Sequence, residues 1–216
     1  MGYYAGFRQV FGPLVRRKIR TVRGTEYLPL QPPFIVAGNH VGFIDALALA
    51  MLNYNRYRRP TYYLTTQWVW KFFGEWLARN VLGMIPLLDV QGSRLADSLG
   101  EAVATLRSGE IVGIFPEAHR NPKPDELLRG KTGAVRMALA TGAPLIPVGV
   151  VNNTGYDFSA AMLSLLRPKT GIDLTFGQPV DLSEFRGQPV DKPLLEAATR
   201  KLMLAISSLC GKKYVF

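Results

Sequence analysis

Residues 34–45 of the chain read FIVAGNHVGFID. The run Phe34–Ala37 is short, apolar and contains β-branched residues, which is typical of a buried strand. Asp45 falls in the first turn of a stretch whose apolar residues recur at helical spacing. The segment therefore predicts a strand, a short loop and a helix, the unit from which α/β folds are built. His40 follows the strand at the sheet edge where such folds place their ligands.

The same alternation of extended apolar runs and longer periodic stretches continues along the chain. Strands are predicted at 34–37, 61–64, 85–88, 111–115, 145–151 and 172–176. Helices are predicted at 44–53, 67–80, 93–107, 130–141 and 192–208. We therefore expect an α/β domain over residues 26–216, with a largely parallel central sheet flanked by helices.

Residues 1–25 are predicted to form a separate amphipathic helical segment. An apolar stripe at helical spacing is bordered there by Arg8 and the basic run 16–18, and Gly12-Pro13 predicts two short helices rather than one. Two interpretations fit the stripe. The segment lies in a lipid interface, or it docks on the domain with a solvated basic edge.

Positive charge is concentrated at the two ends of the chain. Its 26 Lys and Arg residues exceed its 16 Asp and Glu residues by ten. Residues 1–25 hold six basic side chains and residues 200–216 hold four, with no acidic residue in either segment. A polyanion is therefore the expected partner, either an anionic membrane surface or a nucleic acid. Composition alone does not choose between the two. No nucleic-acid motif accompanies the basic cluster at 56–59, so no nucleic acid is expected to bind there.

Composition excludes several other classes. A chain with 48% hydrophobic and 19% charged residues is not disordered. The single Cys210 excludes an internal disulfide and a multi-cysteine metal site. Residues 1–25 lack a continuous apolar run, so no secretory signal is expected. The longest uncharged stretch, 137–156, is interrupted by glycines and prolines, so no transmembrane helix is expected.

Two short segments carry the side chains that could perform chemistry. The spacing of His40 and Asp45 allows a carboxylate to fix one imidazole nitrogen while the other accepts a proton from a hydroxyl, although a structural pair would look the same. Residues 115–121, FPEAHRN, place Glu117 and Arg120 after another predicted strand. Arg120 suits phosphate, whereas Glu117 either holds a substrate hydroxyl or pairs with Arg120.

Four short sequence blocks, which include these two segments, follow the order of the conserved patterns of one protein family. Residues 39–45 match the pattern Asn-His-x4-Asp, and residues 115–120 are similar to Phe-Pro-Glu-Gly-Thr-Arg. Between them, residues 83–90, GMIPLLDV, are similar to Gly-x-Ile-Pro-Val-Asp-Arg, and residues 143–148, APLIPV, form an apolar run around two prolines. From about residue 22 to 176 the chain thus resembles the glycerolipid acyltransferase family, typified by lysophosphatidic acid acyltransferase.

The resemblance implies an enzyme and a mechanism. His40 acts as general base on the free hydroxyl of 1-acyl-glycerol-3-phosphate, and Asp45 orients it. The hydroxyl attacks the thioester of acyl-CoA or acyl-carrier protein and gives phosphatidic acid, without a covalent acyl-enzyme, metal or cofactor. The implied partners are that donor, a lysophospholipid acceptor and an anionic membrane surface. The implied location is the cytoplasmic face of the cell membrane, with peripheral or monotopic attachment.

The resemblance also assigns residues to the acceptor. Glu117 and Arg120 are implied to bind the glycerol phosphate. Lys131 either adds phosphate attraction or is a solvated helix start, and His119 either contacts the headgroup or is an exposed loop histidine. Val90 stands where the second block has its Arg, so Arg94 is the candidate to supply that charge.

Departures from the family pattern leave other functions open. Ala118-His119 replaces Gly-Thr beside the acceptor site, so another lyso-lipid or glycerol 3-phosphate remains an alternative acceptor. A further alternative is that the protein is not an enzyme but a non-catalytic lipid-binding module. Residues 68–76, which hold all three tryptophans, and residues 158–166 are each either lipid contacts or core packing.

Overall fold

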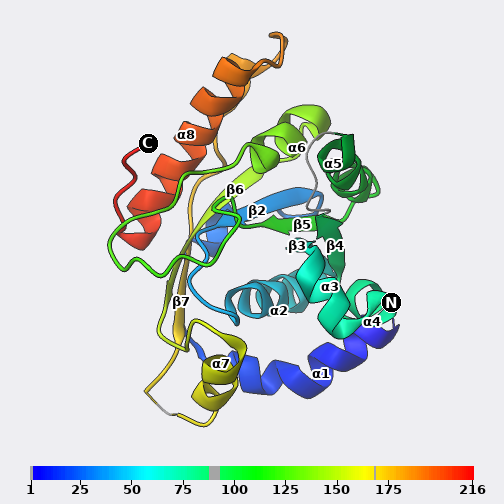
Figure 1. Cartoon of the computed structure of the whole chain (residues 1–216), viewed down its shortest axis with the longest axis vertical. Coiled ribbons are helices and arrows are strands. Elements are labelled where there is room, and N and C mark those ends of the chain that lie inside the picture. The colour runs from blue at the N-terminus through cyan, green and yellow to red at the C-terminus, as the bar shows by residue number, and fades with distance from the viewer. Residues whose placement is uncertain (1, 88–92, 168) are drawn as a thin grey trace.

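The computed structural model describes residues 2–87, 93–167 and 169–216 (Figure 1). The strands are β1 (Ile19–Arg23), β2 (Phe34–Gly38), β3 (Thr61–Thr66), β4 (Met84–Leu87), β5 (Ile111–Ile114), β6 (Leu145–Asn152) and β7 (Ile172–Phe176). The helices are α1 (Gly2–Arg16), α2 (Asp45–Tyr57), α3 (Gln67–Phe73), α4 (Glu75–Asn80), α5 (Ser93–Arg107), α6 (Gly133–Thr141), α7 (Phe158–Ser164) and α8 (Lys192–Cys210). Short 3₁₀ turns lie at Thr25–Tyr27 and Ser183–Phe185.

The strands form one seven-stranded sheet in the order β1-β7-β6-β2-β5-β3-β4. All neighbouring strands are parallel except β6 and β7, which are antiparallel. The predicted α/β class and largely parallel sheet are therefore confirmed. β2, from the segment quoted first, lies at the centre between β5 and β6.

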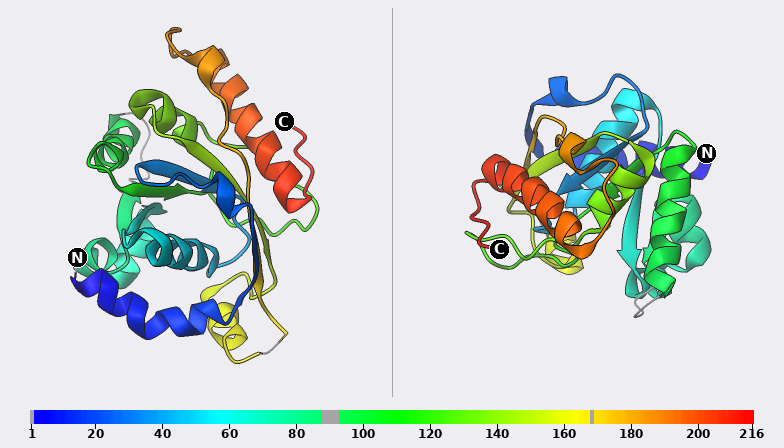
Figure 2. Two further views of the ribbon diagram at one scale, coloured as in Figure 1. Left: turned by 180° about the vertical axis from the view of Figure 1, so that it is seen from behind. Right: turned by 90° about the horizontal axis from the view of Figure 1, so that it is seen from above.

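Helices cover both faces of the sheet, so β2 is buried on both sides. Successive side chains of a strand point to opposite faces. Ile35 and Ala37 accordingly pack in a core with residues of α5, α6 and α8, whereas Phe34 and Val36 pack in a core with residues of α1, α2 and α7. Figures 1 and 2 show α5, α6 and α8 on one side of the sheet and α1, α2, α3, α4 and α7 on the other.

The N-terminal segment differs from its prediction in two respects. α1 is one continuous helix through Pro13, so the predicted break at Gly12-Pro13 is wrong. The reason is tertiary packing: a Cβ at Gly12 would lie 2.5 Å from Cε of Met51 on α2, so the two helices touch there. The second difference is β1, an unpredicted strand within 1–25 that pairs with β7 at the sheet edge.

α1 docks on the domain through one face and exposes the other. Tyr4 and Val15 are buried, and the Tyr4 hydroxyl accepts a hydrogen bond from the backbone N–H of Thr61 at 3.1 Å. The helix therefore docks on the domain, although Arg8, expected on a solvated edge, is buried. Its outer face still presents Tyr3 and Val10, which are 66% and 69% exposed. Among the described residues, no helix is both long enough and apolar enough to cross a bilayer.

The stretch predicted as one helix at 67–80 is two helices separated by Gly74, whose φ of 77° interrupts the helical backbone. Trp70 of α3 is buried and donates from Nε1 to Thr65 Oγ1, as core packing requires. Trp76 of α4 is 57% exposed and lies against Tyr3 of α1. The side chain of Trp68 lies outside the described residues. The two tryptophans that can be placed thus divide between core and surface.

Candidate active site

Three neighbouring strands bring the polar segments of the sequence to one edge of the sheet. His40 follows β2, Phe115 follows β5, and Asn152 ends β6. β2 pairs with both of the other strands, and in this register Gly38 lies opposite Val148 of β6. The loops that leave these strands therefore meet. The sequence had predicted only that His40 and the 115–121 segment each follow a strand.

His40 and Asp45 are in direct contact. His40 Nδ1 lies 3.0 Å from Asp45 Oδ2, and the Asp45 side chain is fully buried. The same oxygen accepts hydrogen bonds from the backbone N–H groups of Val41 and Gly42 at 2.7 and 2.8 Å. The loop between β2 and α2 thus wraps around the carboxylate, and these donors offset the cost of burying its charge.

Asn152 holds the second oxygen of Asp45 and was not identified from sequence. Its Nδ2 donates to Asp45 Oδ1 at 2.5 Å, while its own Oδ1 accepts from the backbone N–H and the hydroxyl of Thr154, both at 2.7 Å. A Cβ at Gly42 would lie 2.8 Å from this Nδ2, so glycine leaves room for the amide. The signal that the sequence offers is that Asn152 directly follows the strand predicted at 145–151.

Replacing Asp45 with asparagine is expected to lower the free energy of unfolding. The two oxygens of Asp45 accept from two sets of donors, the backbone N–H groups of the loop and Nδ2 of Asn152. An asparagine has one side-chain oxygen, so its amide N–H must face one of these sets of donors. An unsatisfied buried donor costs about 1–3 kcal/mol. Urea denaturation of Asp45→Asn measures this loss.

A double variant supplies the matched control. In Asp45→Asn combined with Asn152→Asp, the new carboxylate at 152 accepts both from the amide at 45 and from Thr154. The free energy of unfolding should recover by more than half relative to Asp45→Asn alone. If the single and double variants are equally destabilised, the Asn152 contact does not support Asp45.

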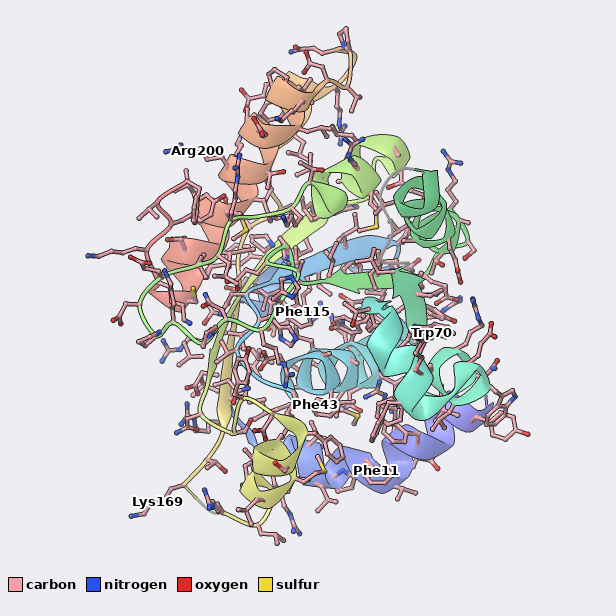
Figure 3. All side chains as sticks on the ribbon, viewed as in Figure 1. Phe11, Phe43, Trp70, Phe115, Lys169 and Arg200 are labelled. Atoms are coloured by element: carbon pink, nitrogen blue, oxygen red, sulfur yellow. The ribbon has the colours of Figure 1, made fainter. Side chains whose placement is uncertain are left out.

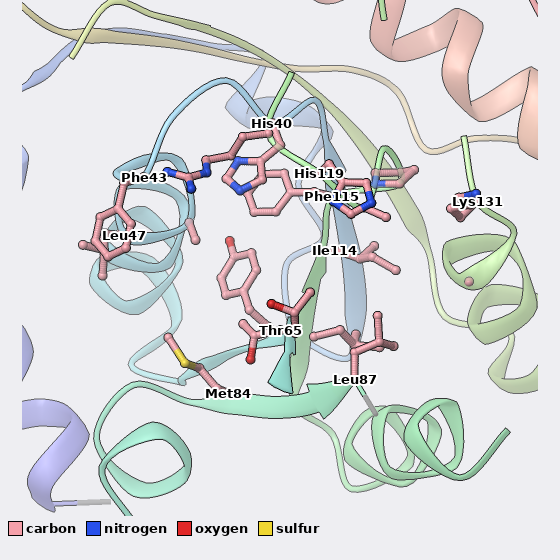
Figure 4. A pocket seen from close by; sticks show the side chains of 18 of the residues that line it. His40, Phe43, Leu47, Thr65, Met84, Leu87, Ile114, Phe115, His119 and Lys131 are labelled. Atoms are coloured by element: carbon pink, nitrogen blue, oxygen red, sulfur yellow. The ribbon is translucent and has the colours of Figure 1, made fainter. Parts of the chain in front are cut away.

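The His40 ring faces a large cavity with one nitrogen free. Because Nδ1 is held by Asp45, Nε2 is the remaining polar atom, and no described residue bonds to it. The ring stacks on Phe115 with centroids 4.1 Å apart, and its side chain is 20% exposed. Figure 4 shows His40 and Phe115 together at one wall of a cavity of about 1760 Å³.

Tyr63 and Arg8 are further polar residues of this cavity that sequence reasoning missed. Tyr63 also stacks on Phe115, with ring centroids 5.7 Å apart, and Gly113 leaves the space for its ring. Burial raises the pKa of the Tyr63 phenol well above its usual value, so the hydroxyl stays neutral. The Tyr63 hydroxyl and Arg8 Nε are buried and have no partner among the described residues. Both residues line the cavity.

Glu117 anchors its loop and forms no ion pair with Arg120 in the part of the chain that the structure describes. The Glu117 side chain is buried and accepts from the backbone N–H of His40 at 3.0 Å, from Asn121 Nδ2 at 2.8 Å and from the backbone N–H of Leu128 at 2.7 Å. Of the two alternatives for Glu117, the ion pair with Arg120 is therefore not formed among the described residues. The buried Glu117 carboxylate already accepts hydrogen bonds from three N–H donors, whereas the Arg120 guanidinium is not within ion-pair distance of it.

Arg120 instead turns toward the segment before α7. Its guanidinium donates to the backbone carbonyl of Tyr156 and lies 4.8 Å from the centroid of the Tyr156 ring. The Tyr156 hydroxyl donates back to the Arg120 carbonyl at 3.1 Å. Ala118 has a φ of 62°, so it adopts the left-handed conformation that favours glycine. A glycine, which the Phe-Pro-Glu-Gly-Thr-Arg pattern has at this position, adopts that conformation at no steric cost.

The remaining candidates lie on the rim of the cavity or outside the described residues. His119 and Lys131 are exposed and line the cavity, as Figure 4 shows. The backbone N–H of Lys131 donates to the Pro116 carbonyl at 2.8 Å, which links the start of α6 to the loop of Glu117. Arg94 belongs to α5, but its side chain is outside the described residues, as is Val90.

Comparisons with known proteins agree on one family. The family model described as Acyltransferase matches residues 19–151. The 1-acyl-sn-glycerol-3-phosphate acyltransferase of Bacillus subtilis strain 168 is 28% identical over 194 residues, covering 88% of each chain. The protein of the same name from Borreliella burgdorferi is 27% identical over 135 residues, which are 62% of this chain and 52% of that protein. The chain thus matches about half the length of the Borreliella protein.

A solved structure has the same fold. The crystal structure of the 1-acyl-sn-glycerophosphate (LPA) acyltransferase PlsC from Thermotoga maritima superposes with a TM-score of 0.62 and 22% sequence identity. The match covers 96% of this chain and 77% of that one.

Proposed function

The chain belongs to the Acyltransferase family, and from this premise we propose that it acylates the free hydroxyl of 1-acyl-glycerol-3-phosphate to give phosphatidic acid. The donor is a thioester, acyl-CoA or acyl-carrier protein. The names of the two curated relatives support this acceptor. The observation that carries the proposal is the His40–Asp45 contact at the wall of a large, mainly apolar cavity.

His40 is proposed to act as the general base. Asp45 keeps the imidazole proton on Nδ1, so the lone pair of Nε2 faces the cavity. Nε2 takes the proton of the acceptor hydroxyl as its oxygen attacks the thioester carbonyl. When the tetrahedral intermediate collapses, the C–S bond breaks and the thiolate takes the proton from the imidazolium. Asp45 stabilises the imidazolium meanwhile, so the step needs no protein nucleophile.

The apolar part of the cavity suits acyl chains. Its lining side chains come from helices on one side of the sheet and include Phe7, Phe11, Leu47, Phe73, Leu77 and Met162. Tyr63 and Arg8 contribute hydrogen-bond donors to this apolar surface, which suits the ester and carbonyl oxygens of the substrates. We therefore assign this region to the acyl groups.

The acceptor phosphate is proposed to bind near Arg120, with His119 and Lys131 as neighbouring donors and Arg94 as a further candidate. Arg120 is held by Tyr156 and has no ion-pair partner among the described residues, so its charge is available. Glu117 acts as a positioning residue because its oxygens accept from the backbone N–H of His40, in the loop after β2, and from that of Leu128.

The protein is proposed to attach to the cytoplasmic face of the membrane as a peripheral or monotopic protein through one apolar face. This apolar face combines exposed side chains of α1, α4 and the region of α7, namely Tyr3, Val10, Phe11, Leu14, Trp76, Leu163 and Leu166. Arg16 and Arg17 are exposed at the end of α1 and would attract anionic lipid.

Not every basic residue of the N-terminal segment serves this role. Arg8 is buried in the cavity, and the ammonium group of buried Lys18 donates to the carbonyl of Arg167 at 2.5 Å. Arg20 pairs with Asp173 on β7. The charge available to lipid is therefore smaller than the sequence count suggests.

A panel of acceptors tests the proposed reaction. The purified chain is given radiolabelled palmitoyl-CoA and vesicles carrying lysophosphatidic acid, lysophosphatidylcholine or no acceptor, or soluble glycerol 3-phosphate. We expect label in phosphatidic acid at the highest rate. Acylation of only another acceptor would move the assignment to that lipid. Lipid binding without any transfer would favour a non-catalytic module.

A further inference from the structure

The turn between β6 and α7 contacts both parts of the proposed site without lining its cavity. We call residues 152–156 the asparagine turn. Asn152 is hydrogen-bonded to Asp45, and Tyr156 is hydrogen-bonded to Arg120. Neither Asn152 nor Tyr156 is among the residues that line the cavity in the described part of the chain. Any effect of this turn on the reaction must therefore pass through Asp45 and Arg120.

Thr154 fixes the orientation of the Asn152 amide. Thr154 is buried, and both its backbone N–H and its hydroxyl donate to Asn152 Oδ1 at 2.7 Å. Because two donors occupy the amide oxygen, Nδ2 is the group that faces Asp45, where it donates to Oδ1 at 2.5 Å. The amide cannot turn over without giving up both contacts with Thr154. Asn152 is therefore a hydrogen-bond donor with a fixed direction.

The turn is packed tightly between α7 and the loop that joins β2 to α2. A Cβ at Gly42 would lie 2.5 Å from the carbonyl oxygen of Gly155, and a Cβ at Gly155 would lie 2.7 Å from that of Ala160 on α7. Phe43 lies on the same side of the sheet as α7 in Figure 3, and its ring centroid is 5.0 Å from that of Phe158. The turn therefore has little room to move relative to this loop or to α7.

A second asparagine fixes the strand that leads into the turn. Asn39 follows β2 and is buried. Its Nδ2 donates to the Val150 carbonyl at 2.9 Å, and its Oδ1 accepts from the Val150 N–H at 2.7 Å. The side-chain amide thus binds β6 as a backbone amide of a neighbouring strand would. Because His40 follows Asn39 directly, the proposed base and Asn152 are held on two segments that are tied together.

We propose that the asparagine turn positions the two groups that act on the acceptor. Asn152 sets the orientation of the His40 imidazole through Asp45, and Tyr156 sets the position of the Arg120 guanidinium. This inference rests on the proposed acyl transfer. The acceptor hydroxyl must reach His40 Nε2 while the phosphate of the same molecule binds Arg120, so the distance between these two groups must be fixed. One short turn that holds both fixes it.

Replacing Asn152 with leucine tests the part of the turn that acts on the base. Leucine has a similar shape but leaves Asp45 Oδ1 without this donor, so kcat for lysophosphatidic acid should fall about tenfold to a hundredfold, as small misplacements of reacting groups do. KM should stay within about twofold, because Asn152 does not line the cavity. Asn153→Leu is the matched control: Asn153 is exposed and its hydrogen bonds are to Gly171, so kcat should not change.

Replacing Tyr156 with alanine tests the part that acts on the acceptor phosphate. The variant loses the ring beside the Arg120 guanidinium and the hydroxyl that bonds to the Arg120 carbonyl. The KM for lysophosphatidic acid should rise about tenfold, the combined effect of one cation–π contact and one hydrogen bond, while kcat changes less than about twofold. Tyr27→Ala removes an exposed ring outside the cavity and should leave both constants unchanged.

A spectroscopic measurement separates this proposal from the proposed function. The Nδ1 proton of His40, bonded to Asp45, should give a downfield ¹H NMR resonance that His40→Ala removes. The resonance should broaden or move upfield in Asn152→Leu and, less strongly, in Thr154→Val, but not in Asn153→Leu. If the wild type transfers no acyl group yet shows these changes, only the proposed reaction fails. The positioning role is overturned if Asn152→Leu leaves the resonance and kcat as in the wild type, or if Asn152→Leu and Asn153→Leu lower kcat equally.

Discussion

Replacing His40 with alanine is expected to lower kcat for phosphatidic acid formation by about a thousandfold, within the range that general base catalysis contributes. Among the described residues, the other groups bonded to Asp45 are backbone N–H groups and the Asn152 amide, and none of them can take the acceptor proton. The measurement is the initial rate of transfer of labelled acyl groups to lysophosphatidic acid at saturating substrate.

Two controls keep this result specific. Thermal unfolding should show that His40→Ala stays folded. The His40 ring is partly exposed, and without it the Asp45 carboxylate still accepts from Val41, Gly42 and Asn152. His119→Ala removes the second histidine of the cavity and should raise the KM for the acceptor while kcat falls less than about tenfold. A His40→Ala variant that keeps kcat near the wild-type value would rule out His40 as the base.

The second large effect concerns the apolar face. The triple variant Val10→Glu, Leu163→Glu and Leu166→Glu is expected to weaken binding to anionic vesicles at least about a hundredfold, because each apolar side chain moved out of water contributes about 1.5–3 kcal/mol. These side chains are 69%, 49% and 83% exposed and do not line the cavity, so the fold and the site should persist. Sedimentation with vesicles gives the partition coefficient.

A matched triple variant controls for the added charge. Val190, Leu204 and Val215 are also exposed apolar residues, but they lie outside the apolar face. Changing these three to glutamate should leave vesicle binding within about threefold of the wild type, since only long-range repulsion is added. Equal losses in the two triple variants would mean that net charge, and not the apolar face, controls attachment.

The sequence predicted the strands and the paired histidine and aspartate well because both are local patterns. The apolar run before His40 and the helical spacing after Asp45 suffice to place a loop whose length brings the two side chains together. The same logic predicted that His40 and the 115–121 segment would each lie at the carboxyl end of a strand. That the two strands are neighbours, so that their loops meet, comes from the structure.

What could not be predicted depends on contacts between distant segments. Asn152 reaches Asp45 from another strand, and Thr199 faces the 129–131 segment from the last helix. Pro13 lies inside a helix because α1 packs on α2, which overrides the local preference for a break. Arg8 is counted as surface charge in the sequence but is buried among aromatic rings.

Order of addition in a trapping experiment tests the central claim most directly, namely that His40 activates the acceptor for direct attack on the thioester. The wild-type chain is incubated with radiolabelled palmitoyl-CoA alone, denatured and analysed by intact-protein mass spectrometry. A parallel sample receives lysophosphatidic acid before denaturation. We predict no label on the protein in either sample, and label in phosphatidic acid only after the acceptor is added and only when His40 is present. A stable acyl group on the protein, or equal transfer by His40→Ala, would contradict the account.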